Sequence, residues 1–271
     1  LCGCSLAVCG LMLQAVFRNP LADPSILGIS SGAGLGVAFV MLLYGGSVSV
    51  GMLSIGGFAT VLAAAFIGAT AVTLLMFSLS SIIRSDAMLL IAGVMVGYLS
   101  SSIIVLLSYY ASEEGLRAYT LWGMGNFASV STERLPLFSI IAVVCLSASV
   151  LLVKSLNILS LGTLYAENLG VNTRQLRGTV LIVTGILTAL TTSFCGPVAF
   201  IGLAVPHIAR MALHTDDYRK LLPATILTGG GMAMACNLAC TMTPSGTMLP
   251  VNAVTPVIGA PVILYVMTKR R

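Results

Sequence analysis

Long runs of sequence without a charged residue are the feature that most constrains how this chain folds. No Asp, Glu, Lys or Arg lies between Asp23 and Arg84, nor between Lys220 and Lys269. A run of about 20 apolar residues is enough for a helix to cross the hydrocarbon core of a membrane. Charged residues make up 8% of the 271 residues, whereas a soluble domain carries about 25%. We therefore predict an all-α, polytopic helical membrane protein and exclude a globular domain surrounded by water.

Glycine, proline and charged residues divide the apolar sequence into nine predicted spans. These are residues 1–17, 25–43, 52–80, 87–110, 135–153, 178–194, 198–213, 221–242 and 250–268. A short amphipathic piece ending at Trp122 follows the fourth span, and polar residues 157–177 follow the fifth. We expect a single transmembrane domain over residues 1–271.

The basic residues fall mostly on one side of the predicted membrane. Nine spans place the two ends of the chain on opposite sides. The side that holds the C-terminus collects Arg18, Arg84, Lys154, Arg174, Arg177, Arg210, Arg219, Lys220, Lys269, Arg270 and Arg271. Only Arg117 and Arg134 lie on the other side. Short loops rich in Lys and Arg stay in the cytoplasm, so we predict a cytoplasmic C-terminus and an outward-facing Leu1.

The sequence lacks the residues that most coupled transport or catalytic chemistry needs. No acidic or basic residue lies near the middle of a predicted span, where proton-coupled transporters usually keep ionisable groups. The sequence does not exclude a sodium site made of backbone carbonyls. No Gly-x-x-x-x-Gly-Lys-Ser/Thr phosphate loop is present. His207 follows Pro206 and is interpreted as a helix-end residue, because no second metal ligand accompanies it. We predict no enzyme activity, no metal site and no cofactor in this chain.

The stretch LGTLYAENLG, residues 161–170, is only partly polar for a connector. Leu161, Leu164 and Leu169 predict the apolar side of one or two short helices. Such helices suit either the membrane interface or the groove of a soluble partner. Gly162 and Gly170 would end them or permit close approach.

Four stretches of the sequence carry a resemblance to a known family. They read RNPLADPSILGISSGAG, LNILSLGTLYAENLGVN, GPVAFIGLAVPHIAR and VNAVTPVIGAPVILYVM. Their order and spacing resemble the FecCD-type permeases, the membrane subunits of ABC importers for iron–siderophore, haem and cobalamin. The resemblance runs from Leu1 to Arg271. It implies an ATP-driven importer subunit of the bacterial inner membrane with ten spans, of which this chain would lack the first.

The resemblance also implies a set of partners. A second permease protomer would pair with this chain, as a homodimer or with a paralogue. Two ATP-binding subunits, which bind ATP and Mg, would dock on the cytoplasmic side. A periplasmic or lipoprotein substrate-binding protein would deliver the cargo from outside, and no nucleic acid is expected. By family frequency, iron–siderophore is the first expectation for the cargo, with haem or cobalamin next.

Site residues follow from the same resemblance. ATPase coupling is expected within residues 157–177, where Gly162, Ala166, Leu169 and Gly170 match the family pattern. The translocation path is expected at the dimer interface. Candidate path residues on the fourth and ninth spans are Tyr98, Ser101, Ser102, Tyr109, Asn252 and Thr255. Candidate docking residues for the binding protein are Arg117 and Arg134.

The segment RNPLADP is interpreted as a cytoplasmic hairpin that acts as scaffold. Its prolines would stop one helix and start the next, and Asp23 would cap the restarting helix. Gly28, Gly32 and Gly36 would then share one helix face that packs closely on a neighbour.

Two other classes of function stay open. A stand-alone secondary transporter or channel would transport without ATP and would need coupling residues at the midplane. A purely structural membrane scaffold would not need residues 161–170 to dock anything.

Overall fold

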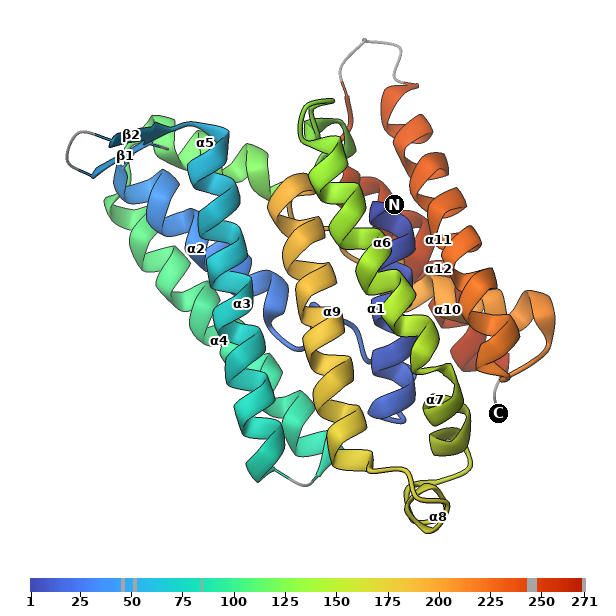
Figure 1. The fold of residues 1–271 in the computed structure, drawn as a ribbon. Coiled ribbons are helices and arrows are strands. Elements are labelled where there is room, and N and C mark those ends of the chain that lie inside the picture. Colours follow the sequence, from blue (N-terminus) through green and yellow to red (C-terminus); the bar gives the residue numbers. More distant parts are fainter. Residues whose placement is uncertain (45–46, 51–52, 84, 243–247, 270–271) are drawn as a thin grey trace.

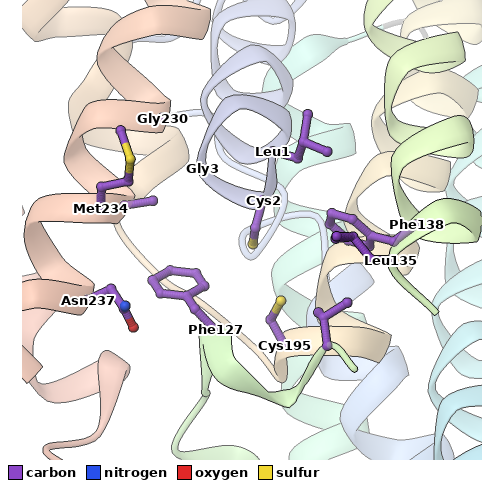
Figure 2. A pocket seen from close by; sticks show the side chains of 12 residues that line it. Leu1, Cys2, Gly3, Phe127, Leu135, Phe138, Cys195, Gly230, Met234 and Asn237 are labelled. Atoms are coloured by element: carbon purple, nitrogen blue, oxygen red, sulfur yellow. The ribbon is translucent and has the colours of Figure 1, made fainter. Parts of the chain in front are cut away.

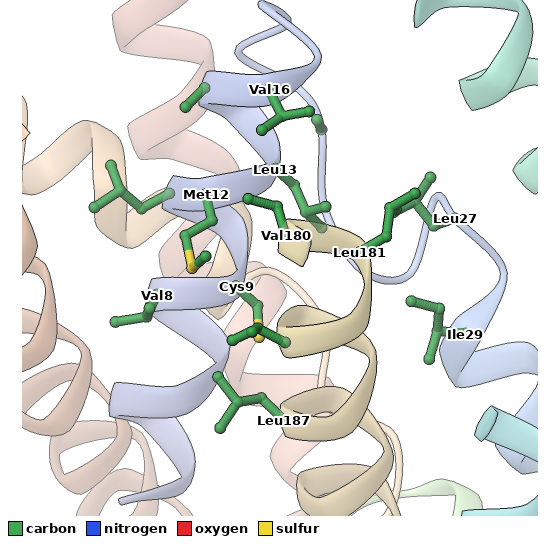
Figure 3. Close-up of a cluster of buried hydrophobic side chains, with 14 of the residues drawn as sticks. Val8, Cys9, Met12, Leu13, Val16, Leu27, Ile29, Val180, Leu181 and Leu187 are labelled. Carbon is green, nitrogen blue, oxygen red and sulfur yellow. The ribbon is translucent and has the colours of Figure 1, made fainter. Parts of the chain in front are cut away.

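α1 (Cys2–Val16) runs through the middle of a helical bundle and is buried along nearly its whole length (Figure 1). The computed structural model describes residues 1–44, 47–50, 53–83, 85–242 and 248–269. Figure 3 shows α1 beside α9 (Thr173–Cys195), with Cys9 and Leu13 near Val180, Leu181 and Leu187. Most residues of α1, and most residues of α9 from Val180 onward, are buried, so these two helices form the centre of the bundle.

The remaining elements surround this centre. They are α2 (Ile29–Tyr44), β1 (Ser47–Val50), β2 (Leu53–Gly56), α3 (Phe58–Ile82), α4 (Asp86–Tyr110), α5 (Glu113–Gly123), the 3-10 turn η1 (Phe127–Ser129), α6 (Leu135–Leu151), α7 (Val153–Ser160), α8 (Thr163–Asn168), α10 (Ile201–Leu213), α11 (Tyr218–Thr241) and α12 (Val251–Lys269). Figure 1 places α5 and the two strands at one end of the bundle and α8 at the other.

An apolar helix occupies each of the nine predicted spans. Four helices, α3, α4, α9 and α11, are long and apolar enough to cross a membrane, and α6 with α7 forms a fifth candidate bent by 48°. The other predicted spans hold the shorter apolar helices α1, α2, α10 and α12. The prediction of a polytopic helical membrane protein is confirmed.

The predicted boundaries differ from the helices of the structure in several places, including the following three. Residues 24–28 form a turn, so the second span becomes helical only at Ile29. The third span begins with an antiparallel hairpin in which Val48 pairs with Ile55, and its helix starts at Phe58. The fifth span continues through a bend to Ser160.

Glycines let α1 touch its neighbours backbone to backbone. A Cβ atom on Gly10 would lie 1.7 Å from the carbonyl oxygen of Gly202 on α10. A Cβ atom on Gly3 would lie 2.2 Å from the carbonyl oxygen of Gly229 on α11. Small residues at such crossings allow the close packing that holds helices together in lipid.

Gly28, Gly32 and Gly36 do not share one helix face, contrary to the prediction. Gly32 and Gly36 lie on α2, where a Cβ atom on Gly32 would lie 2.7 Å from the carbonyl oxygen of Gly68 on α3. Gly28 lies in the turn before α2 with φ +75°, and a Cβ atom there would lie 2.9 Å from the carbonyl oxygen of Gly93 on α4. The positive φ, which glycine adopts without steric cost, takes Gly28 out of the helix.

The RNPLADP hairpin packs against α10. Nε2 of His207 hydrogen-bonds with the carbonyl oxygen of Pro20 at 2.9 Å. His207 is buried in the middle of α10, so the prediction that it ends a helix is wrong. Asp23 is also buried and accepts a hydrogen bond from the backbone N–H of Ser25 at 3.1 Å. Asp23 thus caps the turn before α2 and not α2 itself.

Candidate functional site

The polar segment after the fifth span folds into short helices at one end of the molecule. After α6 the chain bends into α7, and α8 follows at the end of the bundle opposite α5 (Figure 1). Leu156 and Leu159 of α7 and Ala166 of α8 are buried. Their burial fixes both helices to the bundle, because apolar area removed from water is stabilising by about 25 cal/mol per Å².

Other apolar side chains of the same segment face outward. Leu161 is 66% exposed, Leu164 79%, Tyr165 52% and Leu169 54%. We call these four residues the docking face. Apolar side chains gathered at the surface mark sites of contact with a protein or a membrane. The docking face is therefore the part of this segment that can bind a partner.

The predicted coupling residues take different roles in the structure. Leu169 belongs to the docking face, whereas Ala166 is fully buried and only packs α8 against the bundle. Gly162 and Gly170 have φ of +125° and +83°, so they turn the chain on either side of α8. These two glycines therefore set the direction of the helix, and their contact with an ATPase stays a prediction.

A side-chain amide ties α7 to the start of α11. Nδ2 of Asn157 donates a hydrogen bond to the carboxylate of Asp217 at 2.7 Å. The backbone N–H of Tyr218 donates to Oδ1 of Asn157 at 2.8 Å. Sequence reasoning missed this link, because Asn157 and Asp217 are 60 residues apart and nothing local pairs them.

Two further hydrogen bonds tie α8 to its neighbours. The Arg18 side chain, just after α1, donates to the Thr163 hydroxyl at 3.5 Å. The Thr173 hydroxyl, at the start of α9, donates to the Glu167 carboxylate at 2.7 Å. The segment that carries the docking face is thus connected to α1, α9 and α11.

Two arginines of α9 extend the network to the turn between α3 and α4. Arg174 donates to the carbonyl oxygen of Ser81 at 2.9 Å. Arg177 donates to the carbonyl oxygen of Ile83 at 3.2 Å and forms a salt bridge with Asp86. A cavity of about 480 Å³ lies beside these side chains and is also lined by Thr163 and Glu167. The cavity thus lies between α8, the start of α9 and the turn between α3 and α4.

The charge of Asp217 is stabilised in the folded protein. The backbone N–H of Arg219 donates to its carboxylate at 2.9 Å, and Asn157 donates as described above. These hydrogen bonds, followed by the positive charges of Arg219 and Lys220, lower the pKa of Asp217 below its ordinary value. Hydrogen bonds to the ionised form favour it.

The predicted path residues of α4 lie together on its exposed side. Tyr98 is 67% exposed and Tyr109 is 82% exposed. Ser101 and Ser102 are also exposed. Residues spaced by three, four, seven or eleven positions lie on one side of a helix, so the four side chains form one stripe of hydroxyl groups and aromatic rings.

The predicted path residues of α12 do not join that stripe. Thr255 is fully buried, and its hydroxyl donates to the carbonyl oxygen of Val251 at 3.1 Å. The Asn252 side chain is bonded to the carbonyl oxygens of Gly123 and Pro197 at 3.0 and 2.7 Å. Both side chains are therefore occupied within their own protomer, and the structure gives them a packing role.

The two predicted outward arginines differ. Arg117 lies exposed on the amphipathic helix α5, which Ser112 caps through a 3.2 Å hydrogen bond from the N–H of Gly115. Arg134 is half-buried, with its guanidinium 4.4 Å from the centre of the Phe58 ring. Arg117 is thus free of the bundle surface, whereas Arg134 is held by a cation–π contact.

This arrangement defines a class of protein. A bundle of apolar helices, several of them long enough to cross a membrane, is a multi-pass helical membrane protein. The chain belongs to the FecCD transport family, whose model matches residues 1–269. The resemblance seen in the four motifs is confirmed. The family consists of transport permease subunits, and in these systems the ATPase is a separate chain.

Two curated relatives match almost the whole chain. The vitamin B12 import system permease protein BtuC of Photorhabdus laumondii is 34% identical over 274 residues, which cover 99% of this chain and 78% of the relative. The hemin transport system permease protein HmuU of Yersinia pestis is 33% identical over 270 residues, which cover 99% of this chain and 79% of the relative. The chain is therefore the permease of an ABC importer.

Solved structures agree with this assignment. A metal-chelate type ABC transporter in an inward-facing conformation matches with a TM-score of 0.87 and 30% identity, over 99% of this chain and 82% of that chain. PsaBC from Streptococcus pneumoniae matches with a TM-score of 0.63 and 16% identity, over 97% of this chain and 88% of that chain. At 16% identity, the similarity to PsaBC shows only that the two proteins share a fold.

Proposed function

We propose that this chain is the membrane subunit of an importer that moves a bulky metal chelate into the cytoplasm and is driven by a separate ATPase. The observation that carries the proposal is the docking face, Leu161, Leu164, Tyr165 and Leu169. A helix that presents apolar side chains suits the groove of a soluble partner. The ATP-binding subunits, with their ATP and Mg, would receive it.

Hydrogen bonds behind the docking face give a route by which a movement of the ATPase would reach the helices of the bundle. α7 is tied to α11 through Asn157, and α8 is tied to α1 and α9 through Thr163 and Glu167. Hydrogen-bond networks are among the contacts that carry energetic coupling between packed elements. Movement of the docking face would thus reach α1, α9 and α11 together.

The orientation of the chain follows from the position of the docking face. Arg18, Arg174 and Arg177 lie beside this segment, as expected for cytoplasmic positive charge. We place this end and the C-terminus in the cytoplasm. Among the basic residues used for this prediction, Arg84, Arg270, Arg271 and the side chain of Lys269 lie outside the described residues.

The exposed stripe of α4 suits a path shared with a second permease protomer. Tyr98, Ser101, Ser102 and Tyr109 offer hydroxyl groups and rings without a fixed charge. A path of this chemistry would let a large chelate pass without holding it. Selectivity would then rest with a substrate-binding protein, which would dock at the end that carries α5 and the exposed Arg117.

The named relatives decide the order in which cargo should be tested. One is named for vitamin B12 and the other for hemin. We therefore place these corrin and porphyrin chelates ahead of an iron–siderophore, which stays a prediction from family frequency. Uptake of each chelate into proteoliposomes that contain the full importer, with ATP inside, would identify the cargo.

The test of the proposal is co-purification with the ATPase encoded beside the permease gene. Leu164→Glu puts a charge on the docking face, and Asn168→Glu puts the same charge on an exposed polar position of α8. We expect the ATPase to be lost from the first variant and retained by the second. Equal elution volumes in size-exclusion chromatography would show that both variants are folded.

Retention of the ATPase by both variants would overturn the docking assignment. Failure of the wild-type chain to bind any ATPase, together with chelate uptake without ATP, would favour a stand-alone secondary transporter or channel.

A further inference from the structure

Two thiols face each other at the end of the bundle opposite α8. Cys2 lies at the start of α1, and Cys195 is the last residue of α9. Both are free cysteines, and Figure 2 shows their sulfur atoms pointing toward each other. The two side chains line the same cavity. Cysteines from two separate helices thus face each other at one cavity.

A cavity gives reagents access to this pair of cysteines. It measures about 320 Å³, and both cysteines line it together with Phe127, Phe138 and Met234 (Figure 2). Cys2 is partly exposed, whereas Cys195 is only 2% exposed. A reagent that enters the cavity would therefore meet Cys2 first, with Cys195 directly behind it.

We propose that Cys2 and Cys195 are a redox-active thiol pair that closes to an intramolecular disulfide by exchange with a disulfide oxidant. The Cys2 thiolate attacks one sulfur of the oxidant, forms a mixed disulfide and releases the first leaving thiol. The Cys195 thiolate then attacks the Cys2 sulfur of the mixed disulfide and releases the second thiol. Two protein thiols are oxidised, one disulfide is reduced to two thiols, and the two protons pass to these thiols.

The geometry favours closure over a stable mixed disulfide. A disulfide needs sulfur atoms about 2.05 Å apart and Cβ atoms about 3.5–4.5 Å apart. Two thiols that point toward each other at one cavity approach this geometry through side-chain rotations. The buried second thiol also lies closer to the first than a competing thiol from solution.

The bond would join α1 to the break between α9 and α10. The carbonyl oxygen of Cys195 accepts a hydrogen bond from the N–H of Asn126 at 2.7 Å. The next residue, Gly196, has φ +75° and ends α9. The disulfide would therefore attach the start of α1 to the point where the chain after α5 meets the end of α9.

The membrane side on which the two thiols lie follows from the orientation proposed above. Their pairing does not depend on that orientation. The pair lies at the end away from the docking face, which that orientation places outside the cytoplasm (Figure 1). Disulfides form and persist in that compartment. The oxidant would be a small or protein-borne disulfide on the outer side.

The test oxidises the full-length chain in detergent with 4,4′-dithiodipyridine, blocks the remaining thiols with N-ethylmaleimide and maps cross-linked peptides by mass spectrometry. We expect a Cys2–Cys195 cross-link that disappears after reduction. Cys4→Ser, which removes another partly exposed thiol of α1, should retain the cross-link. Cys2→Ser should abolish it, and Cys195→Ser should leave a pyridyl mixed disulfide on Cys2.

Mixed disulfides or maleimide adducts on both cysteines in place of the cross-link would overturn the pairing. A cross-link from Cys4 to Cys195 of equal yield would overturn it as well. Spheroplasts treated with oxidised glutathione, which does not cross the membrane, test the side. A cross-link there supports outward placement, and a cross-link found only in detergent overturns that placement.

Discussion

The side-chain oxygen of Asn252, at the start of α12, accepts a hydrogen bond from the backbone N–H of Ala199 at 3.1 Å. The amide nitrogen of the same side chain donates to the carbonyl oxygens of Gly123 and Pro197. One amide thus joins the end of α5, the break before α10 and the start of α12. The break leaves backbone groups that no helix satisfies, and buried groups of this kind need partners.

Asn252→Asp should destabilise the protein at least as much as Asn252→Ala. Aspartate can still accept from Ala199, but it cannot donate, and its charge would face two carbonyl oxygens. We expect a loss of about 1–3 kcal/mol for each variant, measured by denaturant unfolding of the purified permease. Asn168→Asp, at an exposed position, is the control and should unfold like wild type. An Asn252→Asp variant with wild-type stability would refute the role of the amide.

Gly10→Ala should prevent correct packing of the bundle. The new methyl group would lie 1.7 Å from the carbonyl oxygen of Gly202, and neither backbone can retreat without moving a helix. Gly231→Ala on α11 is the matched control, since a Cβ atom there meets nothing within 4 Å. We expect Gly10→Ala to aggregate in fluorescence-detected size-exclusion chromatography while Gly231→Ala elutes as a single peak. A monodisperse Gly10→Ala protein would show that α1 and α10 pack less closely.

The all-helical membrane class of the fold could be predicted from the sequence because the hydrocarbon core demands long uncharged runs. The role of Asn252 could not, since its partners lie 53 to 129 residues away in the chain. Which side of α8 faces inward was also beyond prediction. A helix of six residues is too short for apolar periodicity to separate the buried Ala166 from the exposed Leu169.

Asp217→Asn should lower the melting temperature at neutral pH. The melting temperatures of the variant and the wild type should converge in acid. The folded pKa of Asp217 is lowered by its hydrogen bonds, so its charge stabilises the fold above the ordinary pKa of 3.8. That contribution is lost as the pH falls through the folded pKa, because the unfolded chain binds the proton first. Melting temperatures measured between pH 7 and pH 3 should therefore fall more steeply for wild type. Parallel curves would mean that the Asn157–Asp217 link does not depend on charge.

Ala166→Leu should loosen α8 without changing the docking face itself. The side chain of Ala166 is fully buried, so three additional carbons must push the helix away from the bundle. Overpacking of this kind costs about 1–3 kcal/mol, which corresponds to roughly 5- to 150-fold faster amide exchange where protection arises from local opening. Hydrogen–deuterium exchange of peptides that cover residues 161–172 measures this directly and needs no partner. Ala166→Gly leaves the space unfilled and is the control for loss of the methyl group. Exchange that is unchanged in Ala166→Leu would show that α8 is not held by this contact, and the ties through Thr163 and Glu167 would then have to hold the helix alone.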